Sequence, residues 1–173
     1  MRVVAGELRG RRLKTPKGTA VRPTSDRARE ALFSILGDVS GFEVLDLFCG
    51  TGALGIEALS RGARHAVLVD DDTSPAQANV DALGITECVD LVRRDAFAYL
   101  GSATATFDLI LCDPPYKLAA RVARDLEKLV PSRLREGGLL VTESPAQTPM
   151  ELNLNLETDR SYGEASIKIW SVT

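Results

Sequence analysis

Short apolar runs alternate with helix-forming stretches along most of this 173-residue chain. We expect a helix that Thr24 or Ser25 caps and that ends near Leu36. Beyond it we expect strands at residues 44–49, 65–70, 89–92, 107–112 and 138–143, separated by helices at 53–61, 74–83, about 96–100 and 118–130. Because parallel neighbours need crossover connections, this alternation predicts a parallel sheet covered on both faces. Two strands without an intervening helix, at 150–156 and 165–172, are expected to complete an α/β domain.

A glycine-rich turn follows the first of these strands. It contains Gly50, Gly52 and Gly55, and a helix-forming stretch comes directly after it. Such glycines allow a tight turn and a close approach of the backbone to a ligand at the helix N-terminus. About 20 residues later the next strand ends in Asp70, which can accept hydrogen bonds from both hydroxyls of an adenosine ribose. Asp95, after the third strand, is placed to meet an adenine amino group. This order of signals predicts a nucleoside-cofactor site.

A second motif, Asp113-Pro114-Pro115-Tyr116, follows the strand at 107–112. Neither proline has an N–H, and the residue before each proline is pushed towards an extended conformation. The motif therefore offers hydrogen-bond acceptors, with few competing donors, at the carboxyl edge of the sheet. This constellation suits chemistry on the amino group of a planar base, with the Tyr116 ring available for stacking. A βα loop that happens to contain two prolines is the structural alternative.

The charge of the chain is divided unequally along its length. Residues 1–29 carry a net charge of +7, whereas the remainder carries −10. Neutralising phosphates with basic side chains releases counterions, so a basic arm on an acidic body is typical of nucleic-acid binding. Apolar residues and glycines punctuate the arm, which predicts a short hairpin rather than a disordered tail. The expected RNA-binding residues are Arg2, Arg9, Arg11, Arg12, Lys14, Lys17 and Arg22.

Taken together, these motifs resemble the class I S-adenosylmethionine-dependent methyltransferases. Residues 1–13, 21–33 and 45–55, the Asp113 motif and Tyr162-Gly163 are similar to one bacterial family, the ribosomal RNA small-subunit methyltransferase D type. The resemblance implies a Rossmann-like, seven-stranded, mostly parallel sheet with a C-terminal antiparallel hairpin. It also implies methyl transfer from S-adenosylmethionine to the N2 amine of a guanine in 16S rRNA, within an assembled or assembling 30S subunit. We expect residues 1–23 to form a basic RNA-binding extension and residues 24–173 the methyltransferase domain.

The resemblance also assigns roles to single residues. Catalysis is expected from Asp113, Pro114, Pro115 and Tyr116, and cofactor binding from Thr24, Arg27, Asp46, Phe48, Gly50, Thr51, Gly52, Gly55, Asp70, Asp95 and Ala96. One departure from the family pattern is that three acids, Asp70-Asp71-Asp72, stand in a row. We expect one acid at the strand end and another two residues later. Asp70 is the first choice for the ribose, although Asp72 remains an alternative. Phe33 is expected either to face the cofactor or target base or to lie at the edge of the core.

Several other classes of function remain open or are disfavoured at this stage. An adenine-N6 methyltransferase acting on DNA or RNA shares the motif order, and an NAD-dependent oxidoreductase shares the glycine loop and Asp70. A non-catalytic RNA-binding module would leave the Asp113 motif unexplained.

The three cysteines share no short spacing, which supports neither disulfides nor a zinc site, and no metal is expected. No apolar run approaches a membrane span or signal peptide, which favours a cytoplasmic protein, with a monomer as the default expectation.

Overall fold

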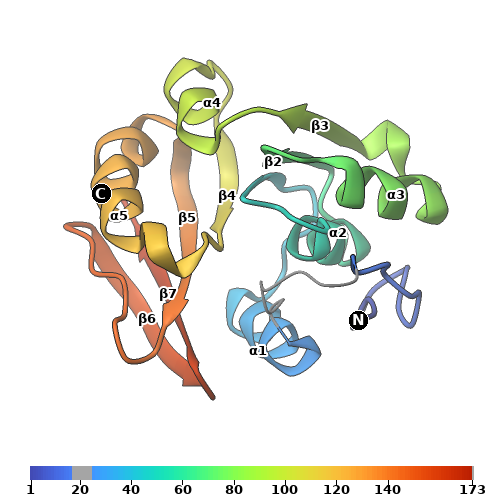
Figure 1. Cartoon of the computed structure of the whole chain (residues 1–173), viewed down its shortest axis with the longest axis horizontal. Helices are drawn as coiled ribbons and strands as arrows, with labels where there is room; N and C mark the ends of the chain where they lie inside the picture. Colours follow the sequence, from blue (N-terminus) through green and yellow to red (C-terminus); the bar gives the residue numbers. More distant parts are fainter. Residues whose placement is uncertain (17–24, 173) are drawn as a thin grey trace.

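Seven strands form a single mixed sheet in the computed structural model, which describes residues 1–16 and 25–172 (Figure 1). The strand order is β3-β2-β1-β4-β5-β7-β6. Strands β1 to β5 pair in parallel, and β7 runs antiparallel to both of its neighbours. The bounds are β1 Glu43–Leu47, β2 His65–Asp70, β3 Val89–Arg93, β4 Phe107–Cys112, β5 Leu134–Pro145, β6 Asn155–Tyr162 and β7 Ala165–Ser171. The expected α/β architecture with a C-terminal antiparallel hairpin is therefore confirmed.

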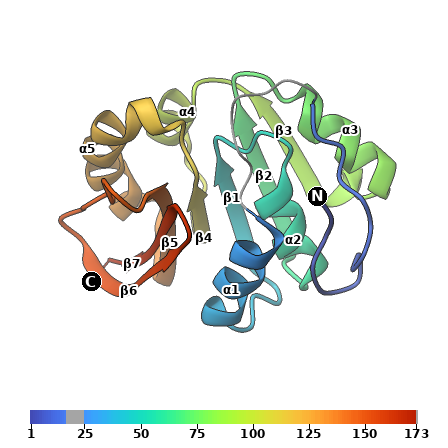
Figure 2. The ribbon, with the colours of Figure 1, turned by 60° about the horizontal axis from the view of Figure 1, so that its bottom comes forward.

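Helices cover both faces of this sheet, as Figures 1 and 2 show. The α-helices are α1 Asp26–Leu36, α2 Ala53–Ser60, α3 Ser74–Leu83, α4 Ala96–Ser102 and α5 Ala119–Leu129, and short 3-10 turns lie at η1 Thr86–Cys88, η2 Tyr116–Leu118 and η3 Val130–Ser132. Buried side chains of α1, α2 and α3 share one apolar cluster, whereas those of α4 and α5 belong to another. In β1, Val44 joins the first cluster and Leu45 the second, because successive side chains of a strand point to opposite faces. None of the helices in the described ranges combines the length and the apolar character that crossing a membrane would require.

Helix α1 begins and ends as its sequence predicts. The Ser25 hydroxyl accepts a hydrogen bond from the Ala28 N–H at 3.1 Å, and Gly37 ends the helix with a φ of 75°. Phe33 is 1% exposed and packs in the core, with the Arg61 guanidinium 5.0 Å from its ring centre. Of the two roles expected for Phe33, the structure supports the one in the core.

The C-terminal part of the chain differs from the prediction. Strand β5 extends beyond the expected 138–143 in both directions, and β6 begins at Asn155 rather than at residue 150. Met150 and Leu152 are buried, but they fill the core from an irregular segment. Their alternation with polar residues in the sequence therefore matches the pattern of a strand although no strand forms there. The true strand β6 is mostly exposed at the edge of the sheet, so it lacks the apolar pattern that identifies a buried strand.

Residues 1–16, which we call the N-terminal arm, fold back on themselves and dock on the domain. Arg2 and Arg12 form an isolated antiparallel bridge, and the Val3 N–H donates to the Arg11 carbonyl at 3.0 Å. Val3 and Leu13 are buried in the cluster that also contains α1 to α3. The arm is thus a loop-like hairpin with a single bridge, and its own apolar side chains hold it against the domain.

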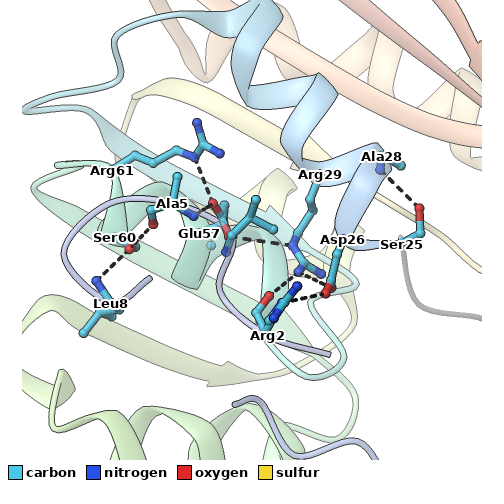
Figure 3. Close-up of polar contacts among 12 residues, drawn as sticks. Arg2, Ala5, Leu8, Ser25, Asp26, Ala28, Arg29, Glu57, Ser60 and Arg61 are labelled. Carbon is cyan, nitrogen blue, oxygen red and sulfur yellow. Dashed lines mark hydrogen bonds and ion pairs between the residues drawn. The ribbon is translucent and has the colours of Figure 1, made fainter. Parts of the chain in front are cut away.

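Buried polar groups of α1 and α2 hold the first half of the arm (Figure 3). The Glu57 carboxylate is fully buried and accepts from the Val4 and Ala5 N–H groups at 2.8 and 3.0 Å. Arg29, also fully buried, donates to the Arg2 carbonyl and lies 3.8 Å from Glu57. The Ser60 hydroxyl accepts from the Leu8 N–H at 3.0 Å and donates to the Ala5 carbonyl. Arg29 therefore contributes to the positive charge counted in the sequence, but it has a structural role.

Candidate functional site

The site lies at β1, where the strand order of the sheet reverses. Strand β2 pairs on one side of β1 and β4 on the other, with Leu47 in register with Cys112. The residues that follow these two strands, Phe48 and Asp113, therefore emerge side by side at the carboxyl edge. In open α/β sheets, such a reversal of strand order is where ligands bind.

A cavity of about 360 Å³ opens at this position. Gly50 and Thr51 of the glycine loop line it, and so do Asp113 and Pro115 of the second motif. The two motifs, which are about 60 residues apart in the sequence, thus face one shared cavity. Any transfer of a group between a cofactor in the glycine loop and an acceptor at Asp113 requires this arrangement.

The glycine loop has the backbone geometry that its sequence predicts. Phe48 leaves β1 with a φ of 61°, so the strand ends at Leu47 rather than at the expected residue 49. Gly52 has a φ of 77°, and its N–H donates to the Cys49 carbonyl at 2.7 Å. A Cβ on Gly55 would lie 2.3 Å from Leu68 Cδ2, so this position has no room for a side chain. Gly52 and Gly55 shape the turn from beneath, and neither is among the lining residues of the cavity.

Asp46, in the middle of β1, is a buried carboxyl group at the floor of the cavity. It is 1% exposed, and its Oδ2 accepts from the Gly55 N–H at 2.9 Å. Burial raises the pKa of Asp46 from 3.8 to about 7, because the charged form loses its solvation; the Gly55 N–H opposes this rise, and the charge of Asp70 adds to it. Burial likewise raises the pKa of the neighbouring Cys49 thiol, which argues against a thiolate nucleophile.

The acidic run after β2 lies along the same cavity. Asp70 accepts from the Gly50 N–H at 2.9 Å and from the Asp72 N–H at 3.1 Å. Asp72 accepts from the N–H and the hydroxyl of Ser74, and these bonds lower its pKa. Asp70 is thus joined directly to the glycine loop, whereas Asp72 bonds to the start of α3. Asp71 is exposed and also lines the cavity.

The charge of the cavity has one sign. Its described lining contains no lysine, arginine or histidine but five aspartates, namely Asp46, Asp70, Asp71, Asp72 and Asp113. Such a lining suits a ligand that carries positive charge and disfavours one that carries phosphate. No group of three or more His, Cys, Asp or Glu side chains in the described ranges is arranged to hold a metal ion.

Several residues expected at the site are not among the described lining residues of the cavity. Asp95 is exposed and caps α4, accepting from the Phe97 and Ala98 N–H groups at 3.1 and 2.8 Å; it is not a lining residue, although Ala96 is. Arg27 is exposed on α1 and does not line the cavity. Pro114 is buried and is not a lining residue, although Asp113 and Pro115 on either side of it are. Thr24, Lys17, Arg22 and the side chain of Tyr116 lie outside what the structure describes, although the Tyr116 backbone begins η2.

The cavity also has walls that sequence reasoning missed. Thr15 and Pro16 of the N-terminal arm line it, together with Pro75 at the start of α3 and Leu118 at the end of η2. Leu118 is 41% exposed and lies two residues after the end of the Asp113 motif. No signal in the sequence relates Thr15 or Pro16 to a loop more than 30 residues away.

The predicted RNA-binding side chains of the arm point mostly to solvent. Arg9, Arg12 and Lys14 are exposed. Arg11 donates to the Ala82 carbonyl at 3.1 Å, and the side chain of Arg2 is 71% exposed at 3.7 Å from Asp26. The arm therefore presents its cations outward while its backbone is held by the domain.

Comparisons with known proteins agree with this geometry. The family model described as "Conserved hypothetical protein 95" matches residues 1–171. The ribosomal RNA small subunit methyltransferase D of Escherichia coli K12 is 32% identical over 161 residues, which are 91% of this chain and 78% of that protein. A solved structure of a Thermus thermophilus protein, titled as hypothetical, superposes with a TM-score of 0.86 at 30% identity, covering 99% of both chains. The chain therefore belongs to the conserved hypothetical protein 95 family, the family of the ribosomal RNA small subunit methyltransferases D.

Proposed function

We propose that this protein transfers a methyl group from S-adenosylmethionine to the exocyclic N2 amine of a guanine in 16S rRNA. The observation that carries the proposal is the single acidic cavity shared by the glycine loop and Asp113. The family relationship supports ribosomal RNA as the substrate, because the Escherichia coli relative is named a small-subunit rRNA methyltransferase. The guanine N2 position is favoured over an adenine N6 amine by the resemblance of the motifs to this family.

The donor half of the cavity fits S-adenosylmethionine. When bound, this cofactor supplies an electrophilic methyl group on a positively charged sulfonium. Asp70 can bind the ribose hydroxyls from its place beside Gly50, and the open space around the Gly50 Cα allows a ligand to approach the loop closely. Asp46 and Asp72 add negative charge around a cationic ligand. The same charges would repel the pyrophosphate of NAD, which argues against the oxidoreductase alternative.

The acceptor half offers the Asp113 carboxylate and the Pro114 carbonyl. Pro114 has no N–H of its own that could compete with the target amine as a donor. We propose that Asp113 and the Pro114 carbonyl accept hydrogen bonds from the target amine. These bonds concentrate its lone pair, which is otherwise delocalised into the ring, and aim it at the methyl carbon. Methyl transfer would form the N–C bond as the C–S bond of the donor breaks, releasing S-adenosylhomocysteine, and the positive charge that develops on nitrogen would lie next to Asp113. The methylated amine would then lose one proton, which Asp113 would accept and pass to solvent. Two unit charges about 4 Å apart interact by ~4 kcal/mol at an effective dielectric of ~20.

The target base must leave its stack before it can enter the cavity. In RNA such recognition uses unpaired bases, which stack on aromatic side chains and are read along their edges. Leu118 gives the mouth of the cavity an exposed apolar surface, and we propose that Tyr116 stacks on the base. The outward arginines of the arm would hold the phosphates around the target. We propose that the substrate is 16S rRNA within an assembled or assembling 30S subunit, that the enzyme acts as a monomer in the cytoplasm, and that no metal takes part.

Methyl transfer to 30S subunits from a strain that lacks the modification tests this proposal. Tritiated S-adenosylmethionine should label 16S rRNA, and mass spectrometry should locate the methyl group on a guanine N2. Asp113→Ala should lower transfer by roughly 10²-fold or more, the scale of losing a positioned electrostatic group. Glu30→Ala, which removes an exposed carboxylate on α1, serves as the control. Near-normal transfer by Asp113→Ala would remove this residue from the mechanism, and binding of NAD in place of the methyl donor would refute the proposal.

A further inference from the structure

The end of the N-terminal arm is part of the wall of the proposed donor cavity. Thr15 and Pro16 line the cavity together with Gly50 and Thr51 of the glycine loop. The arm also carries the outward cations Arg9 and Arg12. One short segment of chain thus connects the surface proposed to bind RNA with the cavity proposed to bind the methyl donor.

The side chain of Asn79 on α3 joins this segment to the glycine loop. It is 1% exposed, and its Oδ1 accepts from the Lys14 N–H at 2.7 Å. Its Nδ2 donates to the Lys14 carbonyl at 3.1 Å and to the Thr51 carbonyl at 3.0 Å. The amide group therefore satisfies both backbone groups of Lys14 and still reaches the loop, which uses both hydrogen-bonding ends of the side chain.

The rest of the arm is anchored without Asn79. Glu57 binds the Val4 and Ala5 N–H groups, and Ser60 binds the Leu8 N–H, on a different helix (Figure 3). Val3 and Leu13 are buried in the core as well. Loss of the Asn79 contacts should therefore release the Lys14 backbone and the Thr51 carbonyl locally, while the arm stays attached to α2.

We propose that Asn79 is a positioning residue that makes residues 14–16 a part of the methyl-donor site and couples donor binding to RNA binding by the arm. This inference rests on the proposed function. A donor that contacts Thr15 and Pro16 holds the segment in the conformation that also orients the cations next to it in the chain. Because linkage is reciprocal, RNA bound to the arm then strengthens donor binding by the same factor.

Two binding measurements test this proposal. The first is the affinity for S-adenosylhomocysteine, measured by calorimetry on the wild-type chain, Asn79→Ala, Asn79→Asp and Gln77→Ala. Gln77 is the matched control, because its exposed amide lies on the same helix and donates to Asp81 of that helix. We expect about tenfold weaker binding for Asn79→Ala, in line with the loss of several hydrogen bonds from a buried group, and no change for Gln77→Ala.

The second measurement is the affinity for a labelled 16S rRNA transcript with and without S-adenosylhomocysteine. We expect the ligand to strengthen RNA binding about fivefold or more in the wild-type chain and in Gln77→Ala. This gain should disappear in Asn79→Ala. A residue that merely stabilises the fold would lower the melting temperature but would leave this dependence on the ligand unchanged.

The possible outcomes separate the inference from the function on which it rests. Unchanged affinity for S-adenosylhomocysteine in Asn79→Ala, or equal RNA binding with and without it in the wild-type chain, overturns the inference. If Asn79→Ala fails to fold, Asn79→Asp decides, since it keeps the volume and the acceptor for the Lys14 N–H but loses both donated bonds. Failure of the wild-type chain to bind S-adenosylhomocysteine at all would instead overturn the proposed function.

Discussion

Replacing Asp46 with Asn should stabilise the protein at alkaline pH and weaken its binding of the methyl donor. The raised pKa of the buried carboxyl group means that the folded chain keeps a proton between pH 3.8 and about 7, whereas the unfolded chain releases it. The free energy of unfolding therefore falls as the pH rises through this window. A rise in pKa from 3.8 to about 7 corresponds to about 4 kcal/mol, all of which is lost above pH 7.

Asp46→Asn cannot ionise, and its amide oxygen can still accept the Gly55 N–H bond that Asp46 accepts at 2.9 Å. Urea unfolding of both proteins between pH 4 and pH 8.5 measures the effect. The two free energies of unfolding should be similar near pH 4, and the variant should be more stable by up to about 4 kcal/mol at pH 8. The difference between the two proteins cancels the pH dependence of all other carboxylates. Parallel curves across the whole range would show that Asp46 ionises normally and would refute the reasoning.

The donor affinity should change in the opposite direction. At pH 8 the Asp46 carboxylate is largely ionised and lines a cavity with four other aspartates, so it attracts a cationic ligand. Calorimetry should show weaker binding of S-adenosylmethionine to Asp46→Asn at pH 8, and a smaller difference at pH 6, where the wild-type group is mostly protonated. A loss that is equal at both pH values would mean that Asp46 acts through its shape and not through its charge. A larger loss at pH 8 would instead make the buried carboxyl group an example of stability given up at a functional site.

Three further outcomes are expected. Replacing the exposed cations Arg9, Arg11 and Arg12 together with Ala should weaken RNA binding. In a salt titration, the slope of log affinity against log salt concentration should be shallower by about 2–3 for this variant. Gly55→Ala should lower the free energy of unfolding by about 1–3 kcal/mol, because the new Cβ would lie 2.3 Å from Leu68 Cδ2. In a double-mutant cycle the same substitution should cost less when Leu68 is already Ala, and an equal cost in both backgrounds would contradict the clash. Glu57→Ala should cost about 3–5 kcal/mol in urea unfolding and expose the arm to proteases, since it removes the buried carboxylate that lies beside the fully buried Arg29.

The sequence predicted the parts of the site that depend on strand ends. Glycine spacing and an acid at the end of the following strand placed Gly50 and Asp70 together, and the structure joins them by a hydrogen bond of 2.9 Å. The carboxyl ends of parallel strands share one edge, which is why Asp113 could be expected near the glycine loop from the sequence alone. Local patterns were sufficient here because sheet topology brings such ends together.

Other features depend on tertiary contacts that no local pattern records. The count of basic residues in the first 29 included Arg29, but the structure buries its side chain against Glu57. Asp95 was expected at the cofactor; no local pattern shows that its Oδ1 also caps the helix that follows it, or that it does not line the cavity while Ala96 does. The contribution of Thr15 and Pro16 to the cavity depends on Asn79, whose role is visible only once α3 is packed against the arm.

The position of β1 between β2 and β4 has an evolutionary consequence. Residues proposed to hold the methyl donor come before Phe107, where β4 begins, whereas those proposed to hold the target base come after Cys112, where it ends. The segment after β4 can then change which base it accepts while the glycine loop and Asp70 keep their small-molecule ligand. A chimera that takes residues 113–118 from a relative of different specificity would inherit the base preference of that relative and keep the methyl-donor affinity and the RNA-binding arm of this chain.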